Sequence, residues 1–398
     1  MAMAVSTFAT LGTGALAPFL RASLHLSTFE VGLIPGLVFL GALASSIPAG
    51  RITDRIGAGR ALSLAQLGVA IGVSIAALAS GRAIFLAGIA LAGIGYGTVN
   101  PATNVLSTGL VPRRRRALFL SVKQMGVTLG GLVAGLMLPH LAQALGWRAA
   151  LAIAAGVLLG GAGVGRWITR RERAGWFAPA GERLDHTRSR EISVSVPGWR
   201  PTALFGFVMS GVQLSLAGYL TLYLVDTHGF SKTTAGVALS VAFAAACLGR
   251  IVWGWLSDRF FASHATTLVL ISVTSVAALA GLASGVKGIS VWLVLVMIGF
   301  LSIGWNGVYM ALITDAATPR DLGRATGRGL TAIYAGVVIL PPLLGAVKDL
   351  ADSWSAVWAV AIAAVVLGAA TLAISPRRRV GIAGEQPSLI DPRADAAA

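Results

Sequence analysis

Apolar runs of about 20 residues follow one another along almost the whole chain, for example at 83–107 and 354–375. A run of this length matches the ~30 Å hydrocarbon core of a bilayer, because an α-helix rises 1.5 Å per residue. Of the 398 residues, 56% are hydrophobic and only 12% are charged, whereas a soluble domain carries about 25% charged residues. Too few charges remain to cover a soluble core, so we predict an integral membrane protein.

The apolar runs predict an all-α membrane protein with twelve transmembrane helices in two parallel six-helix halves. Helices are expected because unpaired backbone groups cannot face lipid, and a barrel would show short alternating strands. The predicted spans are 2–20, 30–50, 61–79, 83–107, 117–140, 147–166, 201–225, 233–256, 265–286, 289–313, 326–347 and 354–375. We therefore expect an N-terminal half at 1–166, a cytoplasmic linker at 167–200, a C-terminal half at 201–375 and a disordered cytoplasmic tail at 376–398.

The distribution of basic residues predicts the orientation. The net charge of +16 lies between the spans, which favours a lipid bilayer and not a nucleic acid as the partner. One side holds only six basic residues, and the other side, with the linker and the tail, holds the rest; the six are Arg21, Arg82, Arg148, Lys232, Lys287 and Lys348. Positive loops mark the cytoplasm, so both termini are predicted to be cytoplasmic. The Ala-, Gly- and Arg-rich composition suggests a bacterial inner membrane.

A short motif occurs twice, once in each half. Gly50 is followed by Asp54-Arg55 after the second span, and Gly254 by Asp258-Arg259 after the eighth. Two parallel halves imply a pseudo-two-fold axis along the membrane normal, with a substrate bound between them near mid-bilayer.

The motif after the second span resembles the G-x-x-x-D-R-x-G signature of the major facilitator superfamily. The six-plus-six layout and the second copy fit the same family, although Ala58, Gly59 and Phe261 depart from its pattern. Lys123-Gln124-x-Gly126 and Gly249-Arg250-x-x-x-Gly254 resemble its small-anion and monocarboxylate branches. The resemblance implies alternating access between the halves.

Charged residues at the motifs are expected to close the cytoplasmic side. A carboxylate there can meet a helix N-terminus or an arginine of the opposite half, and the resemblance implies the same role. We expect Asp315 to be a partner of Arg259. The expected gating set is Gly50, Asp54, Arg55, Gly254, Asp258, Arg259 and Asp315. The alternative, a solvated turn, remains open; Glu30 and Asp226 occupy the opposite side.

Two basic residues enter the spans, and no acidic residue reaches the middle of one. Lys123 and Arg250 lie roughly 10–12 Å from the predicted cytoplasmic boundary. A buried cation without a partner costs several kcal/mol, so we expect an anionic substrate to be its counter-ion. Arginine matches a carboxylate with two hydrogen bonds, and the resemblance implies this role for Arg250. The alternative is that both side chains extend toward the cytoplasmic water.

Uncharged polar residues at similar depth are expected to line the same pocket, because amides and hydroxyls in lipid need partners. Together with Arg250 and Lys123, the expected substrate-binding residues are Gln124, Gln213, Asn306, Tyr309, Tyr334 and Asn100. Thr10, Thr13 and Trp305 are further candidates. The alternative for each is a bond between helices.

The expected function is secondary transport of a small organic, monocarboxylate-like anion, by proton symport or anion exchange. The alternative is a proton-coupled drug exporter of the same superfamily, which usually needs a buried acid in the first half. No HExxH motif, metal cluster or phosphate loop occurs, so we expect no enzyme activity, no metal and no cofactor. The single cysteine, Cys247, excludes disulfides within the chain. A monomer is expected.

Overall fold

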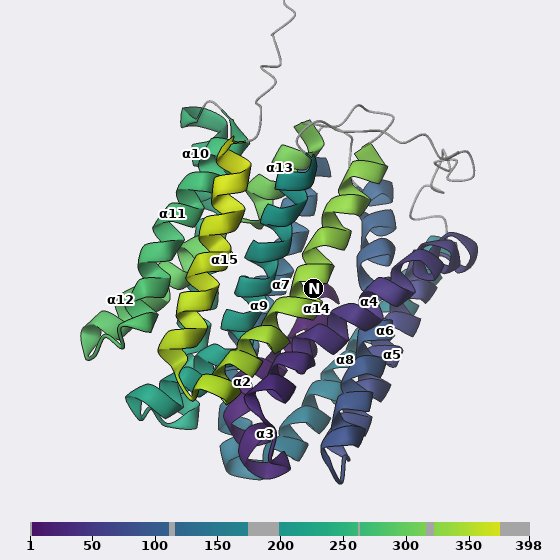
Figure 1. The fold of residues 1–398 in the computed structure, drawn as a ribbon. Coiled ribbons are helices and arrows are strands. Elements are labelled where there is room, and N and C mark those ends of the chain that lie inside the picture. The colour runs from purple at the N-terminus through teal and green to yellow at the C-terminus, as the bar shows by residue number, and fades with distance from the viewer. Residues whose placement is uncertain (1, 111–115, 174–198, 262, 316–321, 375–398) are drawn as a thin grey trace, which may run out of the picture.

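The computed structural model describes residues 2–110, 116–173, 199–261, 263–315 and 322–374, and every regular element in these ranges is a helix (Figure 1). The predicted all-α membrane fold is confirmed. Eleven helices are long and apolar enough to cross a membrane, and a bent pair at the N-terminus gives the twelfth if it is counted as one span.

The first half comprises eight helices, drawn in purple and blue in Figure 1. They are α1 (Ala2–Thr10), α2 (Gly12–Ala15), α3 (Ala17–Leu24), α4 (Thr28–Ile56), α5 (Ala58–Ala77), α6 (Arg82–Leu110), α7 (Arg116–Leu145) and α8 (Trp147–Arg173).

The second half, teal to yellow, follows the gap after Arg173. It comprises α9 (Trp199–His228), α10 (Lys232–Phe260), α11 (His264–Ala283), α12 (Ile289–Met297), the π-helix η3 (Ile298–Ile303), α13 (Asn306–Asp315), α14 (Leu322–Ala351) and α15 (Trp354–Ile374). Several helices extend beyond the predicted spans, because helices continue into the polar boundary where hydropathy no longer marks them. The predicted tail at 376–398 lies outside the described residues.

Two predicted spans are interrupted. The first, predicted at 2–20, is divided into α1, α2 and α3. The segment Ala2–Ala15 meets α3 at an angle of 59°. The tenth, predicted at 289–313, changes from α-helix to π-helix at Ile298. Close contacts accompany both interruptions: a Cβ on Gly14 would overlap the Ala217 carbonyl oxygen, and one on Gly299 would overlap the Ala242 carbonyl oxygen.

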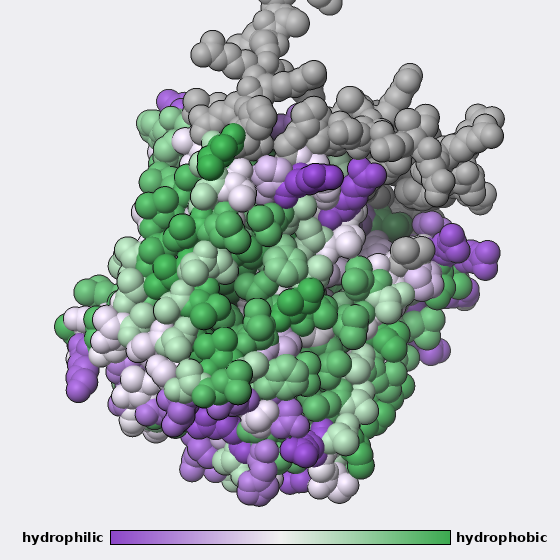
Figure 2. All heavy atoms as spheres, in the orientation of Figure 1, coloured by the Kyte–Doolittle hydropathy of each residue, from purple (hydrophilic) through white to green (hydrophobic). Residues whose placement is uncertain are grey.

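The outer surface is apolar where a bilayer would surround it. Leu64, Ile71, Val273 and Leu293 are large apolar side chains that are more than half exposed. In Figure 2, hydrophobic residues cover the middle of the visible face, and hydrophilic residues gather along its lower rim and upper edge. The chain is therefore a multi-pass membrane protein.

Two helix pairs form most of the contact between the halves, α4 with α14 and α7 with α10. Small residues bring these helices close together. Gly131 on α7 packs against Phe243 on α10, and Gly32 on α4 packs against α14 at Pro341. These two pairs frame the region where the predicted site residues lie.

Candidate functional site

The two ends of the molecule differ in how the halves meet. We call the end that carries Gly50–Arg55 and Gly254–Arg259 the motif side, and the opposite end the far side. On the far side an ion pair joins the halves: Arg21 makes two hydrogen bonds to Asp226, one of them 2.8 Å from Nη1 to Oδ2. Trp354 Nε1 also donates to Asp226, at 3.2 Å. Glu30 instead faces Arg82 of its own half.

A second far-side contact joins α14 to the N-terminus of α4. Asp349 accepts hydrogen bonds from the backbone N–H groups of Thr28, at 2.9 Å, and Phe29, at 2.8 Å. These are among the N–H groups that a helix start leaves without intrahelical partners, and the helix dipole favours a carboxylate there. Nearby, the Tyr219 hydroxyl donates to the Pro341 carbonyl oxygen and lies 3.2 Å from that of Thr28. The far side is therefore closed by polar contacts between the halves.

On the motif side the expected gating residues do not meet. Asp54, Arg55, Asp258 and Arg259 are exposed, and none of the four has an ion pair within the described part of the chain. A Cβ added to Gly50 or Gly254 would contact nothing within 4 Å.

Asp315 was expected to pair with Arg259. It lies 3.0 Å from His264 Nε2 instead. The physical reason is local, because α13 ends beside the start of α11 and both belong to the second half. In this arrangement Asp315 therefore joins two helices of one half.

Three described hydrogen bonds join α7 to α10, and one of them involves Arg250. From the far side they run through Ser240 Oγ to Leu132 O (2.8 Å), then Cys247 Sγ to Thr128 Oγ1 (3.2 Å). Arg250 comes last, and its Nη1 donates to the Gln124 carbonyl oxygen at 3.1 Å. Arg250 and Gln124 therefore face each other across the boundary between α10 and α7. The guanidinium of Arg250 points toward the other half.

Contacts between α4 and α14 include an aromatic pair. Gly36 lies against Val338, and one turn further the rings of Phe39 and Tyr334 meet edge-on at 5.3 Å. Phe39 also meets Tyr96 of α6 edge-on, at 5.9 Å.

Groups of the first half therefore lie beside Arg250. Tyr96 is close enough to interact electrostatically with Arg250 and with Tyr334, and the Tyr334 side chain is hydrogen-bonded to Asn100. We call Phe39, Tyr96, Asn100, Arg250 and Tyr334 the central cluster.

Arg250 has an incompletely satisfied guanidinium. Its Nε is buried and has no hydrogen-bond partner. Within the described residues no carboxylate forms an ion pair with it, and its one hydrogen bond is to a neutral carbonyl. A buried cation in this state favours an anion at the same place. Lys123 lies in α7 next to Gln124, and its side chain is outside the described part.

The side-chain amide of Gln213 is oriented by two hydrogen bonds to its oxygen. Its Oε1 accepts from Trp305 Nε1 at 2.9 Å and from Asn306 Nδ2 at 2.8 Å. An indole N–H can only donate, so it fixes which end of the amide faces Trp305. The Nε2 donors of Gln213 are left for another acceptor.

Tyr309 was expected to line the pocket. It is fully buried in the second half, where it stacks on Phe205 at 6.2 Å. A polar aromatic residue in an apolar span can face either the pocket or the core of its own half, and the sequence does not distinguish these positions.

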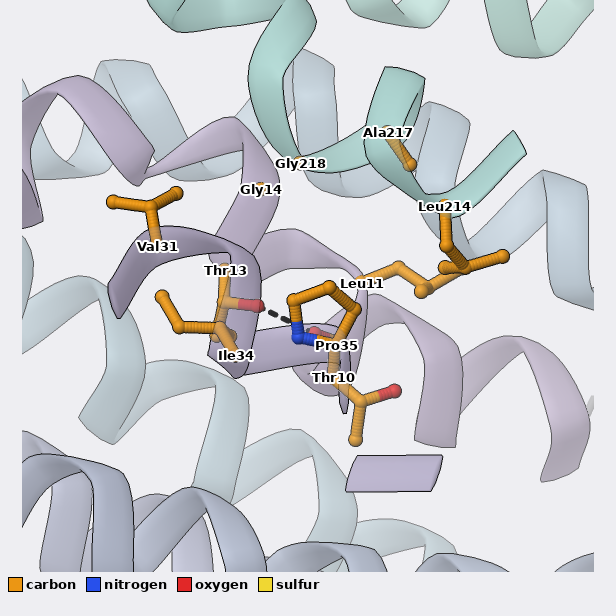
Figure 3. A pocket seen from close by; sticks show the side chains of 10 residues that line it. All are labelled: Thr10, Leu11, Thr13, Gly14, Val31, Ile34, Pro35, Leu214, Ala217 and Gly218. Carbon is orange, nitrogen blue, oxygen red and sulfur yellow. Dashed lines mark hydrogen bonds between the residues drawn. The ribbon is translucent and has the colours of Figure 1, made fainter. Parts of the chain in front are cut away.

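A pocket lies between the halves, between the central cluster and the far side of the molecule (Figure 3). Pro35, one helical turn before Phe39 on α4, is part of its wall. The remaining lining residues are Thr10, Leu11, Thr13, Gly14, Val31, Ile34, Leu214, Ala217 and Gly218. The hydroxyls of Thr10 and Thr13 already donate to backbone carbonyls, at 2.9 and 2.6 Å. The pocket therefore offers a mainly apolar lining.

Phe39, Tyr96 and Asp349 were missed by the sequence analysis. Tyr96 lies between Gly93, which packs against Val38, and Gly97, which packs against Ala42, so its surroundings in the sequence indicate helix packing and not a site. Asp349 looks like an ordinary charge at a helix end.

Comparisons with known proteins agree with the fold. The model of the Major Facilitator Superfamily matches residues 1–317. Solved structures with the same fold include a bacterial homolog of the human lysosomal transporter Spinster in an inward-facing and occupied conformation, with a TM-score of 0.76 and 17% identity over 94% of each chain. A peptide transporter in complex with sulfate gives a TM-score of 0.72 at 18% identity, covering 94% of this chain and 93% of that one.

Three relatives with named substrates cover most of the chain. The gentisate transporter of Corynebacterium glutamicum is 26% identical over 81% of this chain and 73% of its own length. A probable nitrate/nitrite transporter of Mycobacterium tuberculosis is 27% identical over 90% of both chains. The hexuronate transporter of Bacillus subtilis is 26% identical over 85% of this chain and 84% of its own length.

Proposed function

The chain belongs to the Major Facilitator Superfamily, and on that premise we propose that it is a secondary transporter that moves a small organic anion across the membrane by alternating access. Family and fold point to a transporter and not to an enzyme. Gentisate, nitrate or nitrite, and hexuronate are all anions, which supports an anionic substrate here.

One observation carries the proposal: Arg250 lies between the halves with its Nε buried and unpartnered. An organic anion would supply the missing charge and accept hydrogen bonds from the guanidinium fork. The proposed binding set comprises Arg250, Lys123, Gln124, Asn100, Tyr334, Gln213 and Asn306, with the added residues Phe39 and Tyr96.

The arrangement of the halves fits one state of a transport cycle. If the motif side is cytoplasmic, as the basic loops predict, the far-side contacts hold the extracytoplasmic side closed. The cytoplasmic side is then the open one. In the opposite state, the gating residues Asp54, Arg55, Asp258 and Arg259 would meet partners of the other half. Asp315 remains a proposed gating residue on the motif side, where it contacts His264.

Coupling is proposed to be either proton symport or anion exchange. Moving a monoanion into a cell against a membrane potential of 100 mV, negative inside, costs up to ~2.3 kcal/mol, so accumulation needs a second ion. The carboxylates in the described part of the chain lie at or next to helix ends. This disfavours the alternative function, a proton-coupled drug exporter, which usually needs a buried acid in the first half. We further propose a monomer in a bacterial inner membrane, with halves at 1–166 and 201–375 and with the linker 167–200, the tail 376–398 and both termini in the cytoplasm.

The test is uptake of carboxylates into proteoliposomes, with and without an imposed pH gradient. We expect uptake that disappears in Arg250→Ala and persists in Lys287→Gln, which removes an exposed positive charge outside the site. Transport of lipophilic cations with no response to carboxylates would refute the proposal.

A further inference from the structure

Tyr96, which interacts electrostatically with Arg250, belongs to a cluster of aromatic rings. Phe39 meets both Tyr96 and Tyr334 edge-on, at 5.9 and 5.3 Å, so three rings from three helices lie together at the level of Arg250. Phe39 and Tyr334 are only partly buried, and they come from opposite halves. Rings in such a position offer a flat apolar surface to a molecule bound between the halves.

The pocket beside Pro35, one helical turn before Phe39 on α4, also has a mainly apolar lining. Leu11, Val31, Ile34 and Leu214 line it, and it contains no charged side chain. Its two hydroxyl groups are already used by backbone carbonyls. A polyhydroxylated molecule would lose its hydrogen bonds to water here without replacing them, which costs free energy for each unpaired group.

Besides Lys123, Gln124 and Asn306, the proposed binding set contains several neutral polar groups. Tyr96 has a phenol hydroxyl, Asn100 and Tyr334 form one pair, and Gln213 offers its Nε2 donors. Arg250 is the one cation whose side chain the structure describes in the central cluster. This set suits a single carboxylate with at most one or two hydroxyl substituents.

Resting on the proposed anion transport, we propose that the substrate is a planar aromatic monocarboxylate, with its carboxylate on Arg250 and its ring against Phe39, Tyr96 and Tyr334. Aromatic rings prefer offset or edge-to-face contacts with one another, and these add affinity beyond simple burial. A nitrate ion has no apolar body to contact the rings. A sugar acid has more hydroxyl groups than the aromatic rings of the central cluster can pair.

Four probes separate these chemistries in thermal-shift titrations of the purified full-length protein: benzoate, cyclohexanecarboxylate, nitrate and glucuronate. Benzoate and cyclohexanecarboxylate have the same carboxylate and similar size, but only benzoate is planar and aromatic. We expect benzoate to bind about tenfold more tightly than cyclohexanecarboxylate, and nitrate and glucuronate to bind more weakly than either.

The variants Phe39→Leu and Phe243→Leu form a matched pair. Phe243 also packs across the halves, against Gly131, but lies two turns from Arg250 on α10. Phe39→Leu is expected to weaken benzoate binding roughly two- to tenfold and to leave cyclohexanecarboxylate nearly unchanged. Phe243→Leu is expected to leave the ratio of the two affinities unchanged, because a structural loss affects both ligands equally.

The outcomes distinguish this inference from the proposed function. Equal binding of benzoate and cyclohexanecarboxylate, preference for nitrate or glucuronate, or an equal loss for both carboxylates in Phe39→Leu would overturn the aromatic substrate. If the anions that still bind lose their effect in Arg250→Gln, the proposed anion transport survives. If none of the four probes stabilises the protein and the cation tetraphenylphosphonium does, both proposals fail.

Discussion

Asp349→Asn is expected to shift the protein away from the arrangement with a closed far side. The Asp349 carboxylate accepts two backbone hydrogen bonds from the first turn of α4, at 2.9 and 2.8 Å, across the boundary between the halves. The asparagine amide keeps one oxygen that can accept one of the two hydrogen bonds. Its NH2 group cannot accept the other, because it is itself a donor. The substitution also removes the negative charge that the helix start favours.

The magnitude follows from these two contacts. A hydrogen bond to a charged group contributes about 1.5–3 kcal/mol, and solvent exposure of Asp349 reduces this value. We therefore expect the closed far side to lose about 1–2 kcal/mol, which changes the ratio of the two arrangements by a factor of roughly 5 to 30. The loss applies only to the closed state, because the contact joins groups that separate when the far side opens.

The assay is a distance measurement between spin labels at Leu78→Cys and Ile289→Cys in a Cys247→Ser background. Both positions are exposed, at 83% and 77%, and they lie on the far side of opposite halves. Asp349→Asn should increase the population with the longer distance.

Asp352→Asn is the matched control. Asp352 directly follows α14, and a hydrogen bond from Lys348 in the last turn of that helix lowers the pKa of Asp352. The substitution therefore also removes a negative charge, but from a contact that does not bridge the halves. An unchanged distance distribution in folded Asp349→Asn, or an equal shift in the control, would refute the reasoning.

Three further variants test other contacts. Gly14→Ala should lower the melting temperature by several degrees, because its Cβ would overlap a carbonyl of the other half, whereas Gly156→Ala, which meets open space, should not; equal effects would contradict this. Trp305→Phe removes the indole that orients the Gln213 amide and should raise KM several-fold with little change in kcat; an unchanged KM would argue against that role. Asp54→Asn should reduce transport and leave the melting temperature unchanged, since Asp54 has no ion pair in the described structure; a large loss of stability would show a structural role instead.

Much of the fold could be predicted from hydropathy, because each span has to cross the same apolar thickness. The interruptions near Gly14 and at Ile298 could not be predicted in this way. They are associated with close approaches to Ala217 and to α10, and a partner in another helix leaves no local signal in the sequence.

The candidate site was predicted only where charge marked it. Arg250 is conspicuous because a cation in an apolar run is expensive. Phe39 and Tyr96 carry no such mark, since an aromatic residue in a span equally fits lipid contact or packing. Asp349 is invisible for another reason: its partner Phe29 is 320 residues away in the sequence, and only folding brings the two together.

The most direct test of the central claim is the affinity of Arg250→Gln for a carboxylate, measured by equilibrium binding of benzoate beside the melting temperature of the ligand-free protein. Removing the charge partner of a bound anion costs about 2–5 kcal/mol, so affinity should fall more than ~30-fold. The melting temperature should stay the same or rise, because the variant no longer buries an uncompensated cation. Wild-type affinity in Arg250→Gln, or a variant that unfolds without its arginine, would contradict the claim that Arg250 is kept for an anion.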